Sequence, residues 1–175
     1  MTSIRIDCLN GEELDAHAAA LGEIMAQTVM DGAAIGFMQP FSPADGVAFF
    51  TEQVFAEVRA GRRVLLSARL DGEIVGSVQL ITALPPNQPH RCEVAKMMVS
   101  PRARRKGVGR ALMQALDVEA RAAGKTLVTL DTKTGDKAEP LYKDAGFRTA
   151  GVIPGFALDP DAQALHATTY MYKAL

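Results

Sequence analysis

The sequence of 175 residues is poor in cysteine, has no tryptophan and carries a formal net charge of only −1. Its two cysteines, Cys8 and Cys92, form neither a CxxC pair nor a metal-ligand spacing, so buried reduced thiols are expected rather than a disulfide framework. His90 and His166 have no partner at metal spacing and are expected at the surface. We therefore expect no bound metal, and the charge balance does not favour a polyanion-binding protein.

Long apolar runs are missing as well. The longest apolar stretches fall short of the roughly 20 residues that span a bilayer, and residues 1–10 lack the basic start and apolar run of a signal peptide. No GxGxxG motif follows the first strand-like segment, which disfavours a dinucleotide-binding domain. These absences predict a cytoplasmic protein without a membrane partner.

The composition is that of a globular protein, with 48% apolar and 22% charged residues. A chain of this length can bury a sizeable core, so one domain spanning 1–175 is expected. Period-two and helical patterns predict an α+β protein. The predicted strands are 3–8, 63–70, 73–83, 93–99, 127–130, 147–152 and 168–172, and the predicted helices are 10–29, 43–60, 107–124 and 136–144.

Several local signals support these elements. Asp71-Gly72 predicts a two-residue hairpin turn between two strands. Asn10 with Glu13 and Asp136 with Glu139 have capping-box spacing, and Ser42-Pro43 is typical of a helix start. Segment 31–41 contains glycines and a proline among apolar residues and is expected to be a flexible loop.

A basic, glycine-containing segment follows strand 93–99 and opens the next helix. The first N–H groups of a helix have no internal acceptors, and with the helix dipole they form an anion site. Gly107 and Gly109 would let a pyrophosphate approach, and nearby basic side chains would complement its charge. The alternatives are a solvated basic cap and a nucleic-acid-binding module, and the latter is disfavoured because no aromatic residues are interleaved.

Two motifs resemble the GNAT superfamily of N-acetyltransferases. Arg104-x-x-Gly107-x-Gly109 matches the Q/R-x-x-G-x-G/A signature, and Leu141-Tyr142 with Gly146-Phe147 is similar to the family's LYxxxGF junction. The resemblance covers about 91–152. Stretches 131–136 and 151–154 also resemble a bacterial branch that includes tabtoxin-resistance-type acetyltransferases.

The resemblance implies a mixed, mostly antiparallel central sheet flanked by helices, with a splayed central strand pair that binds acetyl-CoA. It implies transfer of the acetyl group to a primary amine by direct attack in a ternary complex. A strand bulge near Met98 or Val99 would supply an N–H to the thioester oxygen. The implied cofactor-binding residues are Met97, Met98, Val99, Arg104, Arg105, Lys106, Gly107, Val108, Gly109, Arg110, Ala111, Gly135, Ala138 and Tyr142.

Three residues are catalytic candidates. Glu93 resembles the position of the base in some family members, and Asp131 ends the next strand where the central strands should splay. For Glu93 the alternative is a solvated surface carboxylate, and for Asp131 it is a turn residue bonded to its own backbone. The resemblance gives Tyr142 the role of proton donor to the leaving thiolate, with a half-buried core tyrosine as the alternative.

The acceptor is expected to be a small-molecule amine selected by segment 31–41, with Phe37 and Met38, and by the tail 153–166. A protein or peptide acceptor is the competing possibility. A non-catalytic regulatory domain that binds acyl-CoA is another, although the presence of Tyr142 disfavours it. A homodimer is the commonest symmetric assembly and is considered for this chain too.

Overall fold

Seven strands form one sheet in the computed structural model, which describes residues 3–175. Residues 1–2, which the expected domain range 1–175 includes, lie outside the described part. The strand order is β1-β2-β3-β4-β5-β7-β6, and only β4 and β5 run parallel. The strands are β1 Ile4–Leu9, β2 Arg63–Leu70, β3 Glu73–Ile81, β4 Arg91–Val99, β5 Leu127–Lys133, β6 Arg148–Leu158 and β7 Leu165–Ala174.

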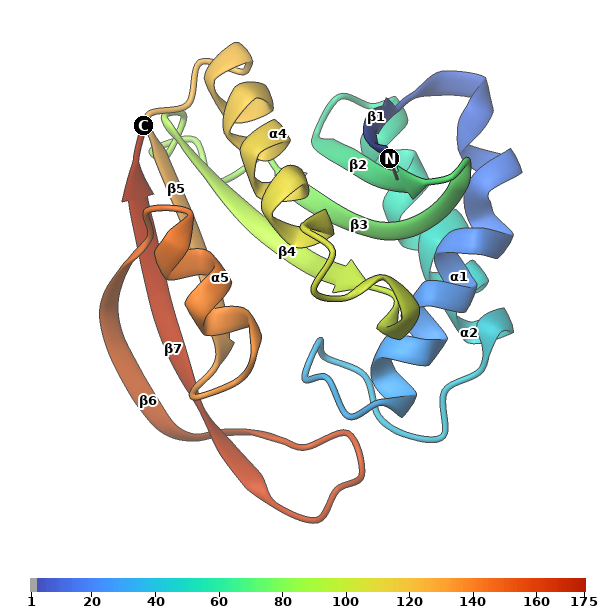
Figure 1. Cartoon of the computed structure of the whole chain (residues 1–175). Coiled ribbons are helices and arrows are strands. Elements are labelled where there is room, and N and C mark those ends of the chain that lie inside the picture. The colour runs from blue at the N-terminus through green and yellow to red at the C-terminus, as the bar shows by residue number, and fades with distance from the viewer. Residues whose placement is uncertain (1–2) are drawn as a thin grey trace.

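Helices cover both faces of this sheet (Figure 1). One buried cluster packs α4 and α5 against the sheet, and a second packs α1 to α3 against the opposite face. The helices are α1 Leu14–Met30, α2 Pro43–Phe49, α3 Phe55–Arg59, α4 Val108–Ala122 and α5 Ala138–Asp144. This confirms the predicted α+β fold with a mixed, mostly antiparallel sheet.

The hairpin between β2 and β3 is confirmed. Asp71 and Gly72 have φ values of 53° and 87°, the left-handed conformation that a two-residue hairpin turn requires. The predicted helix 43–60 is also present, although a π-helical segment, Phe50–Val54, separates α2 from α3. Ser42 and Asp45 form a reciprocal capping box at the start of α2.

The other two capping predictions were wrong. Asn10 makes no side-chain cap, and a 3₁₀ turn at Gly11–Glu13 precedes α1 instead. Lys137 stands at the start of α5, where the carboxylate of Glu139 accepts from the backbone N–H of Gly135. At α5 the Asp136 carbonyl, not its side chain, accepts from the N–H of Glu139.

The predicted burial was also partly wrong. Cys92 is buried, but Cys8 is exposed because it lies on β1, an edge strand. Both thiols are free, as predicted.

Segment 31–41 is a loop, as predicted, and its side chains are packed and hydrogen-bonded to neighbouring elements. The Phe37 ring lies 5.0 Å from the Phe41 ring and 5.1 Å from the Phe49 ring. The Gln39 side chain donates to the carbonyls of Val29 and Met30. Its aromatic residues therefore fix this segment against α1 and α2.

The central strands β4 and β5 diverge along their length. They pair only from Arg91 to Glu93 and from Leu127 to Thr129. Beyond this point β4 continues to Val99 and β5 to Lys133, and Figure 1 shows the opening between them. The edge of β4 that faces β5 is thus unpaired from Val94 onward within residues 3–175, which gives the splayed pair expected from the sequence.

Candidate functional site

A β-bulge interrupts β4 at the point where it leaves β5. Ser77 pairs with Met98 and Gln79 with Ala95, so Lys96 and Met97 stand opposite the single residue Val78. Lys96 has a φ of 50°, which is uncommon for a residue with a side chain. The sequence placed the bulge at Met98 or Val99, one to three residues too late, because hydrogen-bond register cannot be read from composition.

The bulge changes which side chains face the two cores. Cys92 and Val94 belong to the α4 core, and Met97 and Val99 pack against it. Met98 is 1% exposed and belongs to the opposite core. Of the predicted cofactor residues on β4, Met98 can therefore offer only its backbone to a ligand between β4 and β5.

The turn into α4 presents free backbone donors. Gly107 is the N-cap of α4 with a φ of 86°, and Arg105 has a φ of 61°. The first intrahelical bond runs from the Ala111 N–H to the Gly107 carbonyl, at 3.0 Å. Within residues 3–175 no acceptor is found for the N–H groups of 105–110, so the donor set ends at Arg110. Ala111, which was included in the predicted cradle, cannot offer its N–H.

The two glycines of the motif are needed for different reasons. Gly107 needs the left-handed conformation, and a Cβ there would meet only Ile4 Cδ1 at 3.7 Å. A Cβ on Gly109 would lie 2.9 Å from Leu141 Cδ2, so this glycine allows α4 to approach the α5 segment. The sequence suggested that both glycines allow a ligand to approach. The structure gives each of them a further role in the backbone turn or in helix packing.

The basic side chains of the turn are placed differently from one another. The guanidinium of Arg104 forms an ion pair with Asp31 and donates to the Val99 carbonyl. Arg104 therefore ties the turn to the C-terminal end of α1. Arg105, Lys106 and Arg110 are exposed and surround the free N–H groups, where they add positive charge to the helix dipole.

Glu93 and Asp131 line one cavity of about 450 Å³, together with Gln88, Arg91, Thr129, Leu130 and Tyr170. The Glu93 carboxylate accepts from Arg91 Nη1 at 3.2 Å, and its side chain is 39% exposed. Asp131 Oδ2 accepts from the Thr168 hydroxyl at 3.0 Å. Asp131 lies inside β5, not at its end, so the turn alternative for this residue has no support.

Asp131 is electrostatically linked to both sides of the opening. It is among the charges that raise the pKa of Tyr142 on α5, and it opposes the lowering of the Lys96 pKa on β4. Lys96 on β4, Asp131 on β5 and Tyr142 on α5 are therefore close enough for the charge of Asp131 to act on both of the other groups.

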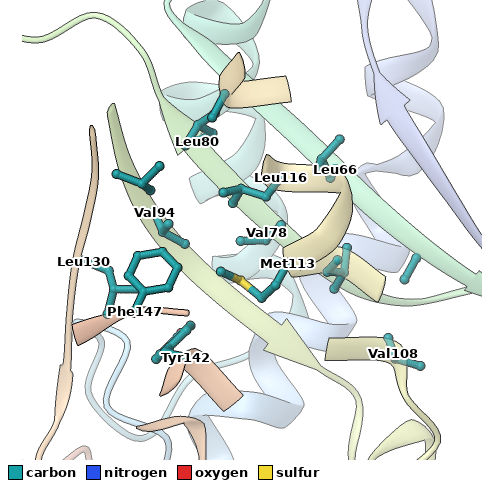
Figure 2. Packing of buried hydrophobic residues seen from close by; sticks show 14 of the residues in the cluster. Leu66, Val78, Leu80, Val94, Val108, Met113, Leu116, Leu130, Tyr142 and Phe147 are labelled. Atoms are coloured by element: carbon teal, nitrogen blue, oxygen red, sulfur yellow. The ribbon is translucent and has the colours of Figure 1, made fainter. Parts of the chain in front are cut away.

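Tyr142 is 6% exposed and belongs to the α4 core. Its ring lies 6.1 Å from that of Phe147, and Figure 2 shows the two side chains next to each other near Leu130. Burial raises the pKa of Tyr142 well above its ordinary value, with Asp136 and Asp131 as further causes. The hydroxyl thus stays protonated at neutral pH and can act as a donor.

The β5–α5 turn gives the last two predicted cofactor residues different settings. Gly135 has a φ of 77°, and its N–H is already bonded to Glu139. Ala138 begins α5 and packs against the α4 core. The N–H of Gly135 is therefore occupied.

Sequence reasoning missed three cations on the face of the sheet that carries Glu93. Arg91 donates to Glu93, Thr129 and Gln88. Arg63 donates to the buried Gln79 at 2.5 Å. Lys96 lies in the bulge, with its amino group 5.4 Å from the centroid of the Phe37 ring. A signal was present for Lys96, because it is the only charged residue in the apolar run 94–99.

The two segments expected to select the acceptor meet in the structure. The Gln39 N–H donates to the Pro160 carbonyl at 2.8 Å, which joins segment 31–41 to the turn between β6 and β7.

His166 was expected at the surface, but its Nε2 is buried without a partner among the described residues. Among residues 3–175, no group of three or more His, Cys, Asp or Glu side chains could hold a metal, and no helix is both long and apolar enough to cross a membrane.

Comparisons with known proteins agree with this geometry. The model of the acetyltransferase (GNAT) family matches residues 26–147. A protein of Azospirillum brasilense, named as an uncharacterized N-acetyltransferase in the hisH-hisA intergenic region, is 38% identical over 80 residues. That match spans 45% of this chain and 48% of the relative, or about half of the relative's length.

Solved structures share the fold at low sequence identity. YncA of Salmonella typhimurium, determined with its cofactor acetyl-CoA, has a TM-score of 0.79 and 22% identity, over 98% of this chain and 94% of that one. The ribosomal-protein-alanine N-acetyltransferase of Brucella melitensis has a TM-score of 0.80 and 21% identity, over 98% and 99%. Since the family model covers more than half of the chain, the protein belongs to the acetyltransferase (GNAT) family. The narrower resemblance to tabtoxin-resistance-type enzymes stays a prediction.

Proposed function

We propose that the protein transfers the acetyl group of acetyl-CoA to a primary amine of a small molecule, by direct attack in a ternary complex. The observation that carries this proposal is the opening between β4 and β5, which has free N–H donors and cations at its α4 end and a cavity lined by Glu93 and Asp131 beside it. Acetyl-CoA would supply an acyl group activated as a thioester. We take residues 1–175 as a single N-acetyltransferase domain.

The chain offers a setting for each part of acetyl-CoA. The N–H groups of 105–110, with Arg105, Lys106 and Arg110, suit a pyrophosphate. The unpaired edge of β4 from Val94 to Val99 suits the amides of the pantetheine arm, which would pair with it like an added strand. A backbone N–H of the bulge at Lys96 and Met97 would serve the thioester oxygen.

Proton movements follow from the positions of the titratable groups. An alkyl amine with a pKa near that of lysine, about 10.4, is mostly protonated at neutral pH and must lose a proton before attack. We assign this step to Asp131, with Glu93 holding the amine. Tyr142 would donate its proton to the thiolate as the carbon–sulfur bond breaks. Its raised pKa keeps the hydroxyl protonated over the working pH range, although it also makes the hydroxyl a weaker acid.

Tyr142→Phe should lower kcat about 100-fold, the lower end of the usual contribution of a positioned proton donor, with little change in the KM of either substrate. Because the pKa of Tyr142 is raised above its ordinary value of 10.0, wild-type kcat should not fall through ionisation of this residue below about pH 10. Steady-state rates from pH 6 to 10 check both statements. Equal kcat values for the two proteins would remove Tyr142 from the mechanism.

The first test is calorimetric titration of acetyl-CoA into the wild type and an Arg110→Glu variant. Each charge-assisted bond to a phosphate contributes about 1.5–3 kcal/mol, so the variant should bind at least about tenfold more weakly. Arg121→Glu is the matched control, because it makes the same charge change at the other end of α4 and should bind normally. A folded wild type that does not bind acetyl-CoA would refute the proposed function.

The size of the cavity supports a small acceptor over a peptide. About 450 Å³ lies within the usual range for small-molecule sites, roughly 300–1,000 Å³. A peptide acceptor is the competing possibility, and an acceptor panel containing both amines and peptides separates the two. A non-catalytic acyl-CoA-binding domain is the third possibility, and CoA release with any acceptor would eliminate it.

The free thiols support the cytoplasm as the location, and fractionation of expressing cells tests this.

We also propose a homodimer. Strands β6 and β7 expose large apolar side chains outside the cavity lining, namely Val152, Ile153, Phe156, Leu158, Leu165 and Tyr172. Within residues 3–175, β6 is an edge strand that pairs with β7 alone, so a second copy could extend the sheet and cover part of this apolar surface. A monomer in sedimentation experiments at micromolar concentration would contradict this assignment.

A further inference from the structure

Two cations on the acceptor face of the sheet have no carboxylate partner among residues 3–175. Arg91 is paired with Glu93, whereas neither Arg63 nor Lys96 takes part in an ion pair there. Both are partly buried, and their positive charges lie close enough for Arg63 to disfavour the charged form of Lys96. This side of the acceptor face therefore carries two positive charges without an ion-pair partner, and only the longer-range attraction of Glu57 for Arg63 and of Asp131 for Lys96 opposes them.

The surroundings of Lys96 fix its position. The left-handed conformation of the bulge places it as an extra residue between Ala95 and Met97, away from the α4 core. Its amino group lies above the Phe37 ring at a distance typical of a cation–π contact, and a Cβ on Gly36 would be 3.4 Å from Nζ. Lys96 thus stands where segment 31–41 meets the sheet.

The neighbouring polar groups are incompletely satisfied. Gln79 is fully buried, and its Oε1 accepts from Arg63 while its Nε2 has no partner. Arg63 Nε is buried and also lacks a partner among the described residues. Buried donors without acceptors are costly, so the unpaired N–H groups add to a positive potential that favours an anion nearby.

The charges of the acceptor face are therefore arranged in two parts. Glu93 and Asp131 line the cavity and suit an amine. Lys96 and Arg63 lie outside the cavity lining but within electrostatic range of each other and, for Lys96, of Asp131, and they suit an anion. We infer that the acceptor is an amine that also carries a carboxylate, as an amino acid does, and that Lys96 binds this carboxylate as a specificity-determining residue. This inference rests on the proposed function, because it concerns the acceptor of the same reaction.

Burial and Arg63 lower the pKa of Lys96, so its charged form is disfavoured in the free protein. Asp131 opposes this shift from across the opening. A bound carboxylate would compensate the desolvated charge, and an uncharged acceptor would not. The free energy of this compensation should appear as selectivity between acceptors.

The test compares L-amino acids with the corresponding L-amino acid amides, measured by CoA release from acetyl-CoA. The amide of each pair lacks the carboxylate, and its amine has a pKa near that of a peptide α-amino group, about 7.7–8.0, so more of it is neutral. The intrinsic reactivity of the amine at neutral pH is thus higher for the amides than for the acids. We expect the wild type to favour the best acids by about 30-fold in kcat/KM, the size of a partly buried charge pair.

Lys96→Met should remove this preference by raising the KM of the acids about 30-fold and leaving the amides nearly unchanged. Lys96→Arg should retain part of it, and Arg121→Met is a control for loss of a distant charge. A loss that is equal for acids and amides would indicate a merely structural role for Lys96 and overturn the inference. Amides used as well as acids by the wild type, or no acid used at all, would overturn it too.

Calorimetry with acetyl-CoA keeps the two proposals separate. If the wild type and Lys96→Met both bind acetyl-CoA and the wild type releases CoA with any amine, any failure of the acid preference belongs to the acceptor inference alone. If the wild type does not bind it, the proposed function fails first. Thermal unfolding of Lys96→Met shows whether the fold is intact, and Lys96→Arg provides the second variant if it is not.

Discussion

Asp131→Asn should lower kcat about 100-fold or more, the usual contribution of a positioned general base. Its carboxylate accepts from the Thr168 hydroxyl, and Asp131 lies beyond the last residue pair of β4 and β5, where the strands have diverged. The asparagine has nearly the same shape but cannot accept the proton of the amine. Steady-state kinetics should show the loss in kcat, with the KM of acetyl-CoA unchanged.

The pH dependence distinguishes a lost base from a damaged site. As the pH approaches the pKa of the acceptor amine, the amine loses its proton to solvent, so the deficit of Asp131→Asn should become smaller. Glu93→Gln is the matched variant on β4. Because Glu93 is already paired with Arg91, we expect mainly a higher KM for the acceptor, by about tenfold, which corresponds to one charge-assisted hydrogen bond. A larger kcat loss in Glu93→Gln than in Asp131→Asn would reverse the two roles.

Gly46→Ala should destabilise the protein by about 3 kcal/mol, the upper part of the usual range for overpacking. A Cβ at this position would lie 2.5 Å from the Gly22 carbonyl oxygen and 2.8 Å from Gly22 Cα. The two helices α1 and α2 thus touch through their backbones, which cannot yield as a side-chain end can. Chemical denaturation should show the change, with a fall in Tm of about 6–12 °C for a chain of this size.

Gly151→Ala is the control for this variant. A Cβ on Gly151 has no neighbour within 4 Å, and its φ is not in the left-handed region. Its stability should stay within about 0.5 kcal/mol of wild type, as for most surface changes. Equal stabilities of Gly46→Ala and wild type would mean that the helices can separate at little cost. Because α2 carries Phe49 against Phe37, Gly46→Ala should also raise the KM of the acceptor.

Local signals in the sequence were sufficient for much of the fold. The Asp71-Gly72 turn, the Ser42 cap and the helix from Val108 depend on a few neighbouring residues, so their patterns predict them. The predicted ends of the strands were less accurate. β5 continues to Lys133 and β6 to Leu158 because pairing with β7 extends them, and such pairing has no local signal.

The motif at Arg104 to Gly109 indicated the family from sequence alone, by its resemblance to the family signature. It also predicted the turn into α4, because a glycine with positive φ before an amphipathic helix is a local requirement. Only the tertiary structure decided which groups of this turn are free. In the structure Arg104 is paired with Asp31, Gly109 packs against Leu141, and the Ala111 N–H is bonded within the helix. The bulge lies at Lys96 and Met97, and the amino group of Lys96 lies over the Phe37 ring. These features depend on strand register and on contacts between segments distant in the chain, which a single sequence does not encode in any local pattern.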